Sequence, residues 1–560
     1  VVGLLLFQDI DPRMQHAIFA EFYKPYRENR YLEDYPMRPS LPFTKSIADR
    51  FNSVFAALFC LLLLSPARGQ DLQPKLAALE AYAEQALTEW EVPGFAMAVV
   101  YRDSLVFSKG FGTRTLGKNE PVDGNTIFAI ASNSKAFTAA CIGILVDEGR
   151  LDWDDRVIDY LPSFKLSDSY VTREMRIRDL MSHRSGLKTF GGDLLWYGST
   201  YSTEEVLRRA AFLPLTSSFR SEYGYQNLMF TVAGAVVEAV TDSSWEDFVT
   251  ARILEPLGMK RTLTSVSAFA NTGNIATPHN LSPGKLGPVG YKNVDAVAAA
   301  AGLNSCVADL SRWMRLQLGR GAWRDIRIFS KRASWEMWTP HMPLPLSPAA
   351  VEMMPSRHFR ATGLGWFLND YQGRLVVSHG GALDGMLSQT VLVPEEELGV
   401  VCLTNGETAL QVALTNKAVD LFLDAPETDW SKLFLSRGER GKQREAKRDS
   451  TLLANRAKKS KPSLDLDAYA GTYEDVFYGS ATITRDGKNL HLQLGASPAF
   501  KARLSHWHYD TFLIEWDPGV YYDFPMGFVT FRLDSQGVVS GFDFDQPNND
   551  FHFDEMNFRR

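Results

Sequence analysis

The sequence has few cysteines, and none of them is spaced like a metal ligand. Only four of the 560 residues are cysteine, and no C-x-x-C pair or Cys/His cluster typical of a zinc site occurs. Cys141 and Cys402 lie in apolar stretches, which predicts buried free thiols that pack as small hydrophobic side chains. The H-x-H pair of His506 and His508 has no third ligand nearby, which favours a surface pair on a strand. We therefore expect no metal and no cofactor.

A strong charge excess and a long hydrophobic segment are also missing. The formal net charge is −7, so the overall charge does not favour nucleic acid or an anionic membrane as a partner. The apolar run at residues 54–64 is too short to span about 30 Å of hydrocarbon. Because Lys45 and Arg50 precede it, we interpret it as the hydrophobic part of a secretory signal peptide, with a buried core helix as the alternative.

This interpretation divides the start of the chain in two. Residues 1–36 are expected to be a misassigned start or an extension, and residues 37–70 to be the signal peptide, cleaved near residue 70. The mature protein is therefore expected to be periplasmic or secreted.

The region at residues 71–430 has strand patterns near both of its ends and helical patterns between them. Residues 94–112 are typical of a β-hairpin with its turn at Arg102 and Asp103, and strand patterns return at residues 375–404. This predicts an α+β domain, in which one antiparallel sheet combines both chain ends and is flanked by helices.

The amino-acid pattern changes twice in the last part of the chain. Residues 437–461 hold ten Lys or Arg and three Asp or Glu, so we interpret residues 431–463 as a basic linker or an exposed helix. From residue 464 to 560 short alternating strands follow one another, one pair joined by Asp486 and Gly487. This pattern predicts a small C-terminal antiparallel β-barrel.

The first motif with chemical content is Ser132-Asn133-Ser134-Lys135 at the start of an apolar helical stretch. Ser132 and Lys135 are three residues apart, so both side chains face one side of the first helical turn. A lysine in a desolvated site can be neutral and accept the proton of a serine hydroxyl. The N–H groups of the helix N-terminus can also stabilise an oxyanion.

Two further short motifs lie downstream. Tyr225 and Asn227 directly precede an apolar helix; a tyrosine with a lowered pKa can relay protons, and an asparagine can hold a lysine and a substrate amide. His379-Gly380-Gly381-Ala382 ends a predicted strand, where glycines allow a substrate chain to lie along the strand edge. Taken singly, each motif is also compatible with a turn, a bulge or a helix cap.

Taken together, the three motifs resemble those of the penicillin-binding serine hydrolase family, which includes class C β-lactamases, D,D-carboxypeptidases, D-aminopeptidases and esterases. Further segments that resemble the family are residues 181–187, 255–259, 302–305, 363–366 and 398–405, so the resemblance covers roughly residues 75–425. It implies a β-lactamase/transpeptidase-like fold, with an antiparallel sheet flanked by helices and an all-helical region, and an active site between the sheet and that region.

The resemblance also implies a role for each motif residue. Ser132 would be the acylated nucleophile, Lys135 its base and Tyr225 a proton shuttle. Asn227 would orient the lysine and the substrate. The substrate and oxyanion contacts would come from the third motif, His379, Gly380, Gly381 and Ala382, with the N–H groups of Ser132 and Ala382 forming the oxyanion hole.

One departure bears on the substrate. The third motif of β-lactamases begins with Lys-Thr-Gly, whereas here His379 is followed by two glycines, so the fixed cation that grips a carboxylate is missing. This is closer to the D-amino-acid-specific peptidases and some esterases of the family. The C-terminal barrel resembles the lipocalin-like domain of the peptidase-type members, chiefly through Tyr469-Ala470-Gly471-Thr472-Tyr473.

We therefore expect a serine hydrolase that acts through an acyl-enzyme on a small amide, an ester or a peptide, including peptides with D-amino acids. A β-lactamase or D,D-carboxypeptidase and a non-catalytic penicillin-binding sensor are the alternatives. An α/β-hydrolase is disfavoured because the chain has no G-x-S-x-G motif. The expected partner is the small-molecule or peptide substrate, with the barrel available for homo-oligomer assembly.

Overall fold

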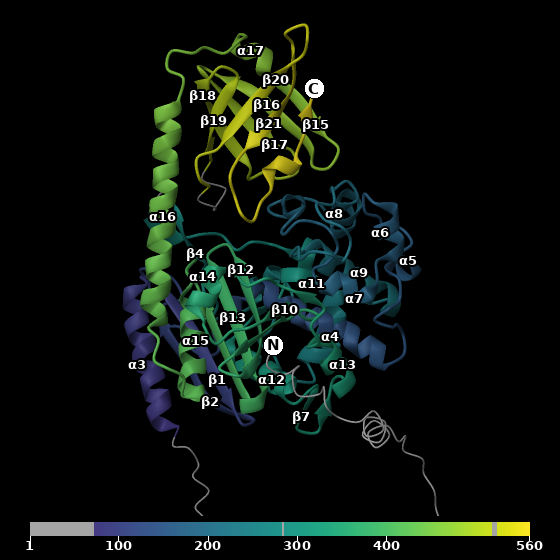
Figure 1. Ribbon diagram of the computed structural model, residues 1–560, viewed down its shortest axis with the longest axis vertical. Coiled ribbons are helices and arrows are strands. Elements are labelled where there is room, and N and C mark those ends of the chain that lie inside the picture. Colours follow the sequence, from purple (N-terminus) through teal and green to yellow (C-terminus); the bar gives the residue numbers. More distant parts are fainter. Residues whose placement is uncertain (1–71, 283–284, 518–523) are drawn as a thin grey trace, which may run out of the picture. The chain divides into compact units, whose positions relative to one another are not determined.

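Two β-structures, an eight-stranded open sheet and a closed eight-stranded barrel, form the framework of the computed structural model (Figure 1). It describes residues 72–282, 285–517 and 524–560. The predicted signal peptide and the residues before it lie outside this part, so that interpretation stays a prediction. Leu72–Arg560 form one unit, within which the domain limits near residues 430 and 463 also stay predictions.

The open sheet is antiparallel and combines both ends of the hydrolase-like region, as predicted. Its strands, in spatial order, are β2 (Ser104–Gly112), β1 (Gly94–Tyr101), β14 (Leu398–Thr404), β13 (Met386–Val393), β12 (Arg374–Leu383), β11 (Phe367–Tyr371), β10 (Arg360–Thr362) and β9 (Met342–Pro343). The predicted hairpin turn is present: Arg102 and Asp103 both have positive φ, 48° and 54°, which suits a tight two-residue connection.

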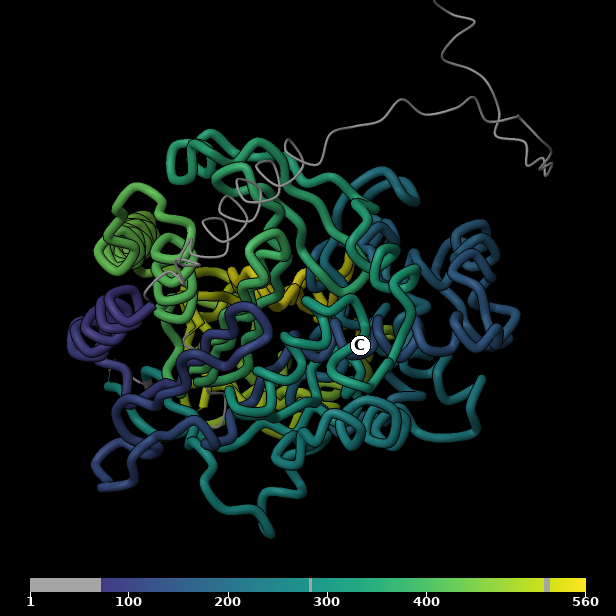
Figure 2. Tube along the Cα trace, turned by 90° about the horizontal axis from the view of Figure 1, so that it is seen from below, coloured from purple at the N-terminus to yellow at the C-terminus, as the bar shows by residue number. Residues whose placement is uncertain are grey.

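Helices cover both faces of the sheet, which is why every residue of β1 is buried. Phe95, Met97 and Val99 point to the side of α3 (Gln73–Glu89) and α15 (Leu410–Leu423). The alternate residues, beginning with Ala96, point to the opposite side, where α4 (Ser134–Asp147) and α12 (Val307–Leu318) pack. Figure 2 shows that α3 lies beside the helices that follow β14, although the two segments are far apart in the sequence.

The helical region is inserted between β2 and β10. Its helices include α5 (Val157–Tyr160), α6 (Ser169–Glu174), α7 (Ile177–Met181), α8 (Thr203–Ala210), α9 (Leu228–Thr241), α10 (Trp245–Val249), α11 (Ala298–Ala301), α13 (Lys331–Met337) and α14 (Pro348–Met353). Most of α9 is apolar and buried, so this helix is a central element of the core. The expected mixed fold of sheet and helices is confirmed.

The segment interpreted as a basic linker is largely one long helix, α16 (Trp430–Asn455), most of which faces solvent (Figure 1). Its first residue is anchored, because the buried Trp430 indole donates a hydrogen bond to Asp420 at 2.6 Å. The short α17 (Leu466–Tyr469) then leads into the barrel.

The predicted C-terminal barrel is present and closed. Its strands are β15 (Gly471–Asp475), β16 (Gly479–Asp486), β17 (Asn489–Leu494), β18 (Lys501–His508), β19 (Thr511–Trp516), β20 (Phe528–Leu533), β21 (Val539–Asp545) and β22 (Phe558–Arg559). Buried aromatic rings pack inside it: the Phe542 ring lies 5.6 Å from that of Phe531 and 5.0 Å from that of Tyr473. Such packing contributes about 0.5–1.5 kcal/mol per pair beyond area burial.

Two further findings concern the described residues as a whole. Cys141, Cys306 and Cys402 are buried free thiols, as predicted for the first and last of them. No helix in the described ranges is long and apolar enough to cross a membrane.

Candidate active site

Ser132 lies in a short 3₁₀ turn, η1 (Ala131–Asn133), directly before α4. Ala131 has a φ of 44°, in the left-handed region that a non-glycine residue adopts only when its surroundings hold it there. The support comes partly from β13, because Ser388 donates a hydrogen bond to the Ile130 carbonyl at 2.8 Å and accepts one from Asn133 at 2.8 Å. The turn that carries Ser132 is therefore fixed against the sheet.

Lys135 lies one turn further along, with its ammonium group directed at Ser132. Its Nζ is 3.0 Å from Ser132 Oγ, 2.6 Å from Asn227 Oδ1 and 3.0 Å from the Ala300 carbonyl. The side chain is fully buried, and burial lowers the pKa of Lys135 to about 7, although the nearby Asp193 carboxylate opposes this shift. Lys135 can therefore be neutral near physiological pH and accept a proton from Ser132.

Asn227 connects Lys135 to a carboxylate that the sequence motifs did not include. It directly precedes α9, and its Nδ2 donates to Asp193 Oδ2 at 2.6 Å. Asp193 begins the 3₁₀ turn η2 (Asp193–Leu195) and also accepts a hydrogen bond from the Trp196 indole at 2.9 Å. Burial raises the pKa of Asp193 to about 7, and the two hydrogen bonds act against this rise. Asp193 was missed because a single acidic residue in a loop has no spacing pattern.

Tyr225 contacts Ser132, but the expectation of a lowered pKa is wrong. The pKa of Tyr225 is raised because the side chain is desolvated, and the hydrogen bond with Ser132 opposes this only in part. Its ring stacks on His183, with centroids 4.3 Å apart, and lies 4.9 Å from Lys135 Nζ. Tyr225 is thus a neutral phenol, which can donate a proton but does not serve as a resting phenolate.

His379 lines the same pocket as a neutral side chain. Only 2% of its surface is exposed, and burial together with the nearby Lys135 lowers the pKa of His379 to about 3. Its Nδ1 is 2.6 Å from the Gly380 carbonyl, and its buried Nε2 has no hydrogen-bond partner among the described residues. His379 is therefore an uncharged side chain of the pocket and supplies no positive charge to a substrate carboxylate.

The strand segment after His379 runs against the turn of Ser132. β11 pairs with β12 only as far as Ser378, so residues 379–383 keep one edge free of β11. A Cβ on Gly381 would lie 2.2 Å from the Ile130 carbonyl oxygen and 3.0 Å from the Ser132 amide nitrogen. Glycine is therefore required here for the close approach of two backbones, a role that the sequence analysis did not anticipate. Ala382 follows on the same strand and also lines the pocket.

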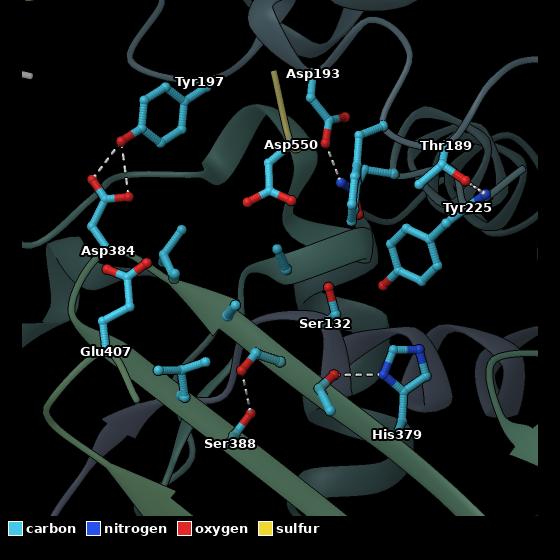
Figure 3. Close-up of a pocket in the computed structure, with 18 of the residues that line it drawn as sticks. Ser132, Thr189, Asp193, Tyr197, Tyr225, His379, Asp384, Ser388, Glu407 and Asp550 are labelled. Atoms are coloured by element: carbon cyan, nitrogen blue, oxygen red, sulfur yellow. Dashed lines mark hydrogen bonds between the residues drawn. The ribbon is translucent and has the colours of Figure 1, made fainter. Parts of the chain in front are cut away.

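The pocket has a second end that is acidic. The whole pocket has a volume of about 490 Å³. Asp384, Glu407 and Asp550 line it together with Ser132. Figure 3 shows Asp384 and Glu407 on the side away from Tyr225 and His379. Asp384 accepts hydrogen bonds from the Tyr197 hydroxyl at 2.9 and 2.7 Å and pairs with Lys292 at 3.1 Å.

Glu407 and Asp550 add negative charge at this end. Glu407 keeps contact with solvent, yet the surrounding protein and the neighbouring carboxylates Asp384 and Asp550 raise its pKa to about 7. Asp550 and the adjacent Phe551 come from the barrel segment between β21 and β22, so the barrel forms part of the pocket wall. In the described part of the chain, no group of three His, Cys, Asp or Glu side chains is placed to hold a metal ion.

The structure thus brings together all the residues of the three motifs. Ser132, Tyr225, Asn227, His379, Gly380, Gly381 and Ala382 line one pocket, and Lys135 lies directly behind Ser132.

A family model described as Beta-lactamase matches residues 79–424, more than half of the chain. The chain belongs to this family. Its members form the β-lactamase/penicillin-binding-protein-like superfamily of serine hydrolases, so the resemblance drawn from the motifs is confirmed. A second model, described as a domain of unknown function (DUF3471), matches residues 455–560, which contain the barrel.

Relatives and solved structures agree with this membership. The chain is 29% identical to unguisins hydrolase ungD' of Aspergillus campestris (strain IBT 28561), over 72% of this chain and 76% of that protein. It is 28% identical to penicillin-binding protein 4 of Amycolatopsis lactamdurans, over 60% of this chain and 85% of that protein. The fold is similar to that of the octameric penicillin-binding protein homologue from Pyrococcus abyssi, with a TM-score of 0.56 and 20% identity, covering 87% of this chain and all of that one.

Proposed function

We propose that this protein is a serine hydrolase that acylates Ser132 and acts on a small amide, peptide or ester. The observation that carries the proposal is the buried Lys135, whose Nζ lies 3.0 Å from Ser132 Oγ and whose pKa is lowered to about 7. A serine beside a base that is neutral near physiological pH has the arrangement that nucleophilic catalysis requires.

The geometry supports a two-step reaction. Neutral Lys135 takes the proton of Ser132 as Oγ attacks the acyl carbon, and Asn227 holds the lysine in place. The N–H groups of Ser132 and Ala382 are proposed to bind the developing oxyanion. The neutral phenol of Tyr225 donates its proton to the leaving group and is reprotonated from Lys135. Water then attacks the acyl-enzyme by the same steps in reverse.

The charge distribution of the pocket supports neutral or cationic substrates over anionic ones. His379 is neutral, and Asp384, Glu407 and Asp550 line the other end, where Asp384 pairs with Lys292. A substrate carboxylate would be repelled there, which disfavours penicillins and peptides with a free carboxyl end. The relative named unguisins hydrolase is consistent with a hydrolytic reaction; the relative named penicillin-binding protein keeps reaction with penicillin as the second candidate.

The proposal is tested by turnover of a p-nitrophenyl ester, a D-amino-acid p-nitroanilide and penicillin by the wild type and Ser132→Ala. We expect turnover of the neutral ester and the anilide, slow or no reaction with penicillin, and a loss on the order of 10⁵-fold in the variant. Full activity of Ser132→Ala contradicts the proposal, and absence of turnover of all three substrates by the wild type supports the non-catalytic sensor instead.

Location and assembly are part of the same proposal. We propose that the protein is exported and acts in the periplasm or outside the cell, on the basis of the apolar run at residues 54–64. We further propose that the barrel mediates assembly of a homo-oligomer; the homologue from Pyrococcus abyssi is named as octameric. N-terminal sequencing of the exported protein tests the proposed export, and sedimentation of the mature chain tests the proposed assembly.

A further inference from the structure

Asp193 determines which end of the Asn227 side chain faces Lys135. Above the Asp193 pKa of about 7 the carboxylate is ionised and only accepts hydrogen bonds, so it then faces the NH₂ group of the amide. Asp193 Oδ2 accepts from Asn227 Nδ2 at 2.6 Å, and its other oxygen is occupied by the Trp196 indole at 2.9 Å. The Asn227 oxygen is thereby left to face Lys135 Nζ, 2.6 Å away. Asp193 itself is only 3% exposed, and its side-chain hydrogen bonds within the described part of the chain are with Asn227 and Trp196, not with Ser132.

The loop that leads into Asp193 is held by the barrel. Glu555, in the short turn η7 (Phe553–Glu555) before β22, accepts a hydrogen bond from the Gly192 amide at 2.9 Å. Lys188 pairs with Asp554 at 3.1 Å and with Glu555 at 3.7 Å. The Glu555 side chain is only 4% exposed, so this is a buried contact and not a solvated surface pair.

The same loop also contacts the segment that carries Tyr225. His552 Nε2 donates to the Thr189 carbonyl at 2.7 Å, and Thr189 Oγ1 accepts from the Tyr225 amide at 3.1 Å. Gln226 donates to the Lys188 carbonyl at 2.6 Å. The barrel, the loop at residues 188–193 and the segment before α9 therefore form one continuous hydrogen-bonded assembly.

We propose that Asp193 is a positioning residue that holds Asn227 in the orientation that Lys135 needs, and that Glu555 of the barrel holds Asp193 in place. The inference rests on the proposed function, because it assumes that Lys135 serves Ser132. It assigns the C-terminal barrel a part in the catalytic machinery, in addition to its part in the pocket wall. A loss of this restraint lets Asn227 rotate and moves the lysine, and a misplacement of about 1 Å can reduce a rate about 100-fold.

The test measures the rate at which a fluorophosphonate acylates Ser132, by intact mass, from pH 5 to 9, in four full-length variants. Asp193→Asn presents an NH₂ group or a single oxygen to Asn227 in place of a carboxylate. Glu555→Ala removes the acceptor for the Gly192 amide, whereas Glu555→Gln keeps a side-chain oxygen that can accept it. Asp467→Ala removes an exposed carboxylate elsewhere on the barrel domain, which pairs with Arg485, and serves as the matched control.

We expect Asp193→Asn to react about 100-fold more slowly and Glu555→Ala about 10-fold more slowly. Glu555→Gln should recover most of the rate lost in Glu555→Ala, and Asp467→Ala should react like the wild type. The pH midpoint of the reaction should fall in Asp193→Asn, because the Asp193 charge raises the pKa of Lys135. The other titratable groups around Lys135 are His183, His379 and Tyr225, and all of them remain in the variant.

The outcomes separate the inference from the function on which it rests. A folded Asp193→Asn with the rate and pH midpoint of the wild type overturns the positioning role. Equal losses in Glu555→Gln and Glu555→Ala overturn the role of the Gly192 hydrogen bond. If circular dichroism shows that Asp193→Asn does not fold, the comparison of Glu555→Ala with Glu555→Gln tests the inference by itself. A wild type that forms no adduct on Ser132 contradicts the proposed function instead.

Discussion

The two ends of the pocket differ in charge, in the parts of the chain that form them and in how far the sequence predicted them. The reactive end consists of Ser132, Lys135 and Tyr225, all from the region matched by the family model, and it is buried and close to neutral at pH 7. The acidic end gathers Asp384 from the β12–β13 turn, Glu407 from the β14–α15 loop and Asp550 from the barrel domain. Under the proposed function, the chemistry belongs to the first end and the choice of substrate to the second.

The largest effect is expected at the reactive end. Lys135→Ala and Tyr225→Phe should each lower kcat by about 10³-fold or more, because both side chains move the proton of one reaction. The double variant should lose little more than either single one, since residues that act as a unit are non-additive. Steady-state turnover of a neutral ester measures this, with the exposed Lys118→Ala as the control. Losses that multiply would show that the two residues act independently.

An effect of intermediate size is expected in the pH dependence of acylation, which reports on the reactive end. Only neutral Lys135 accepts a proton, and its pKa is lowered from 10.5 to about 7, so the acylation rate should rise through about pH 7 and then level off. Below the midpoint the rate should fall about tenfold per pH unit. Rates measured with an uncharged phosphonate between pH 5 and 9 test this. A midpoint near pH 10 would show that Lys135 is not desolvated in the working enzyme.

The smallest effect is expected at the acidic end. Glu407→Gln combined with Asp550→Asn removes two carboxylates near the substrate and should raise reactivity toward a carboxylate-bearing ester about fivefold relative to a neutral one. This corresponds to about 1 kcal/mol, typical of a solvent-screened charge interaction. The ratio of kcat/KM values for the two esters measures it, and Glu427→Gln, 92% exposed, is the control. An unchanged ratio would mean that this end does not select by charge.

Sequence patterns predicted the reactive end but not the acidic end, and the reason is physical. Ser132 and Lys135 are three residues apart on one helical turn, so local geometry alone places them together, and the strand and helix periodicity predicted the sheet and the barrel. Asp193, Glu407 and Asp550 are single acidic residues in loops, where side chains of this kind are usually only solvated. Tertiary packing brings them to the pocket. Burial raises the pKa of Asp193 and lowers that of His379, and it also raises the pKa of Tyr225, which was predicted to be lowered.

The most direct measurement of the central claim is the position of the covalent adduct after treatment with a fluorophosphonate. We expect tryptic peptide mapping by mass spectrometry to locate one adduct, on the peptide that contains Ser132. The adduct should be absent from Ser132→Ala and retained in Ser134→Ala, because Ser134 is buried and donates its hydroxyl to the Ala131 carbonyl at 2.7 Å. An adduct on another serine, or labelling that persists in Ser132→Ala, would contradict the assignment of Ser132 as the nucleophile.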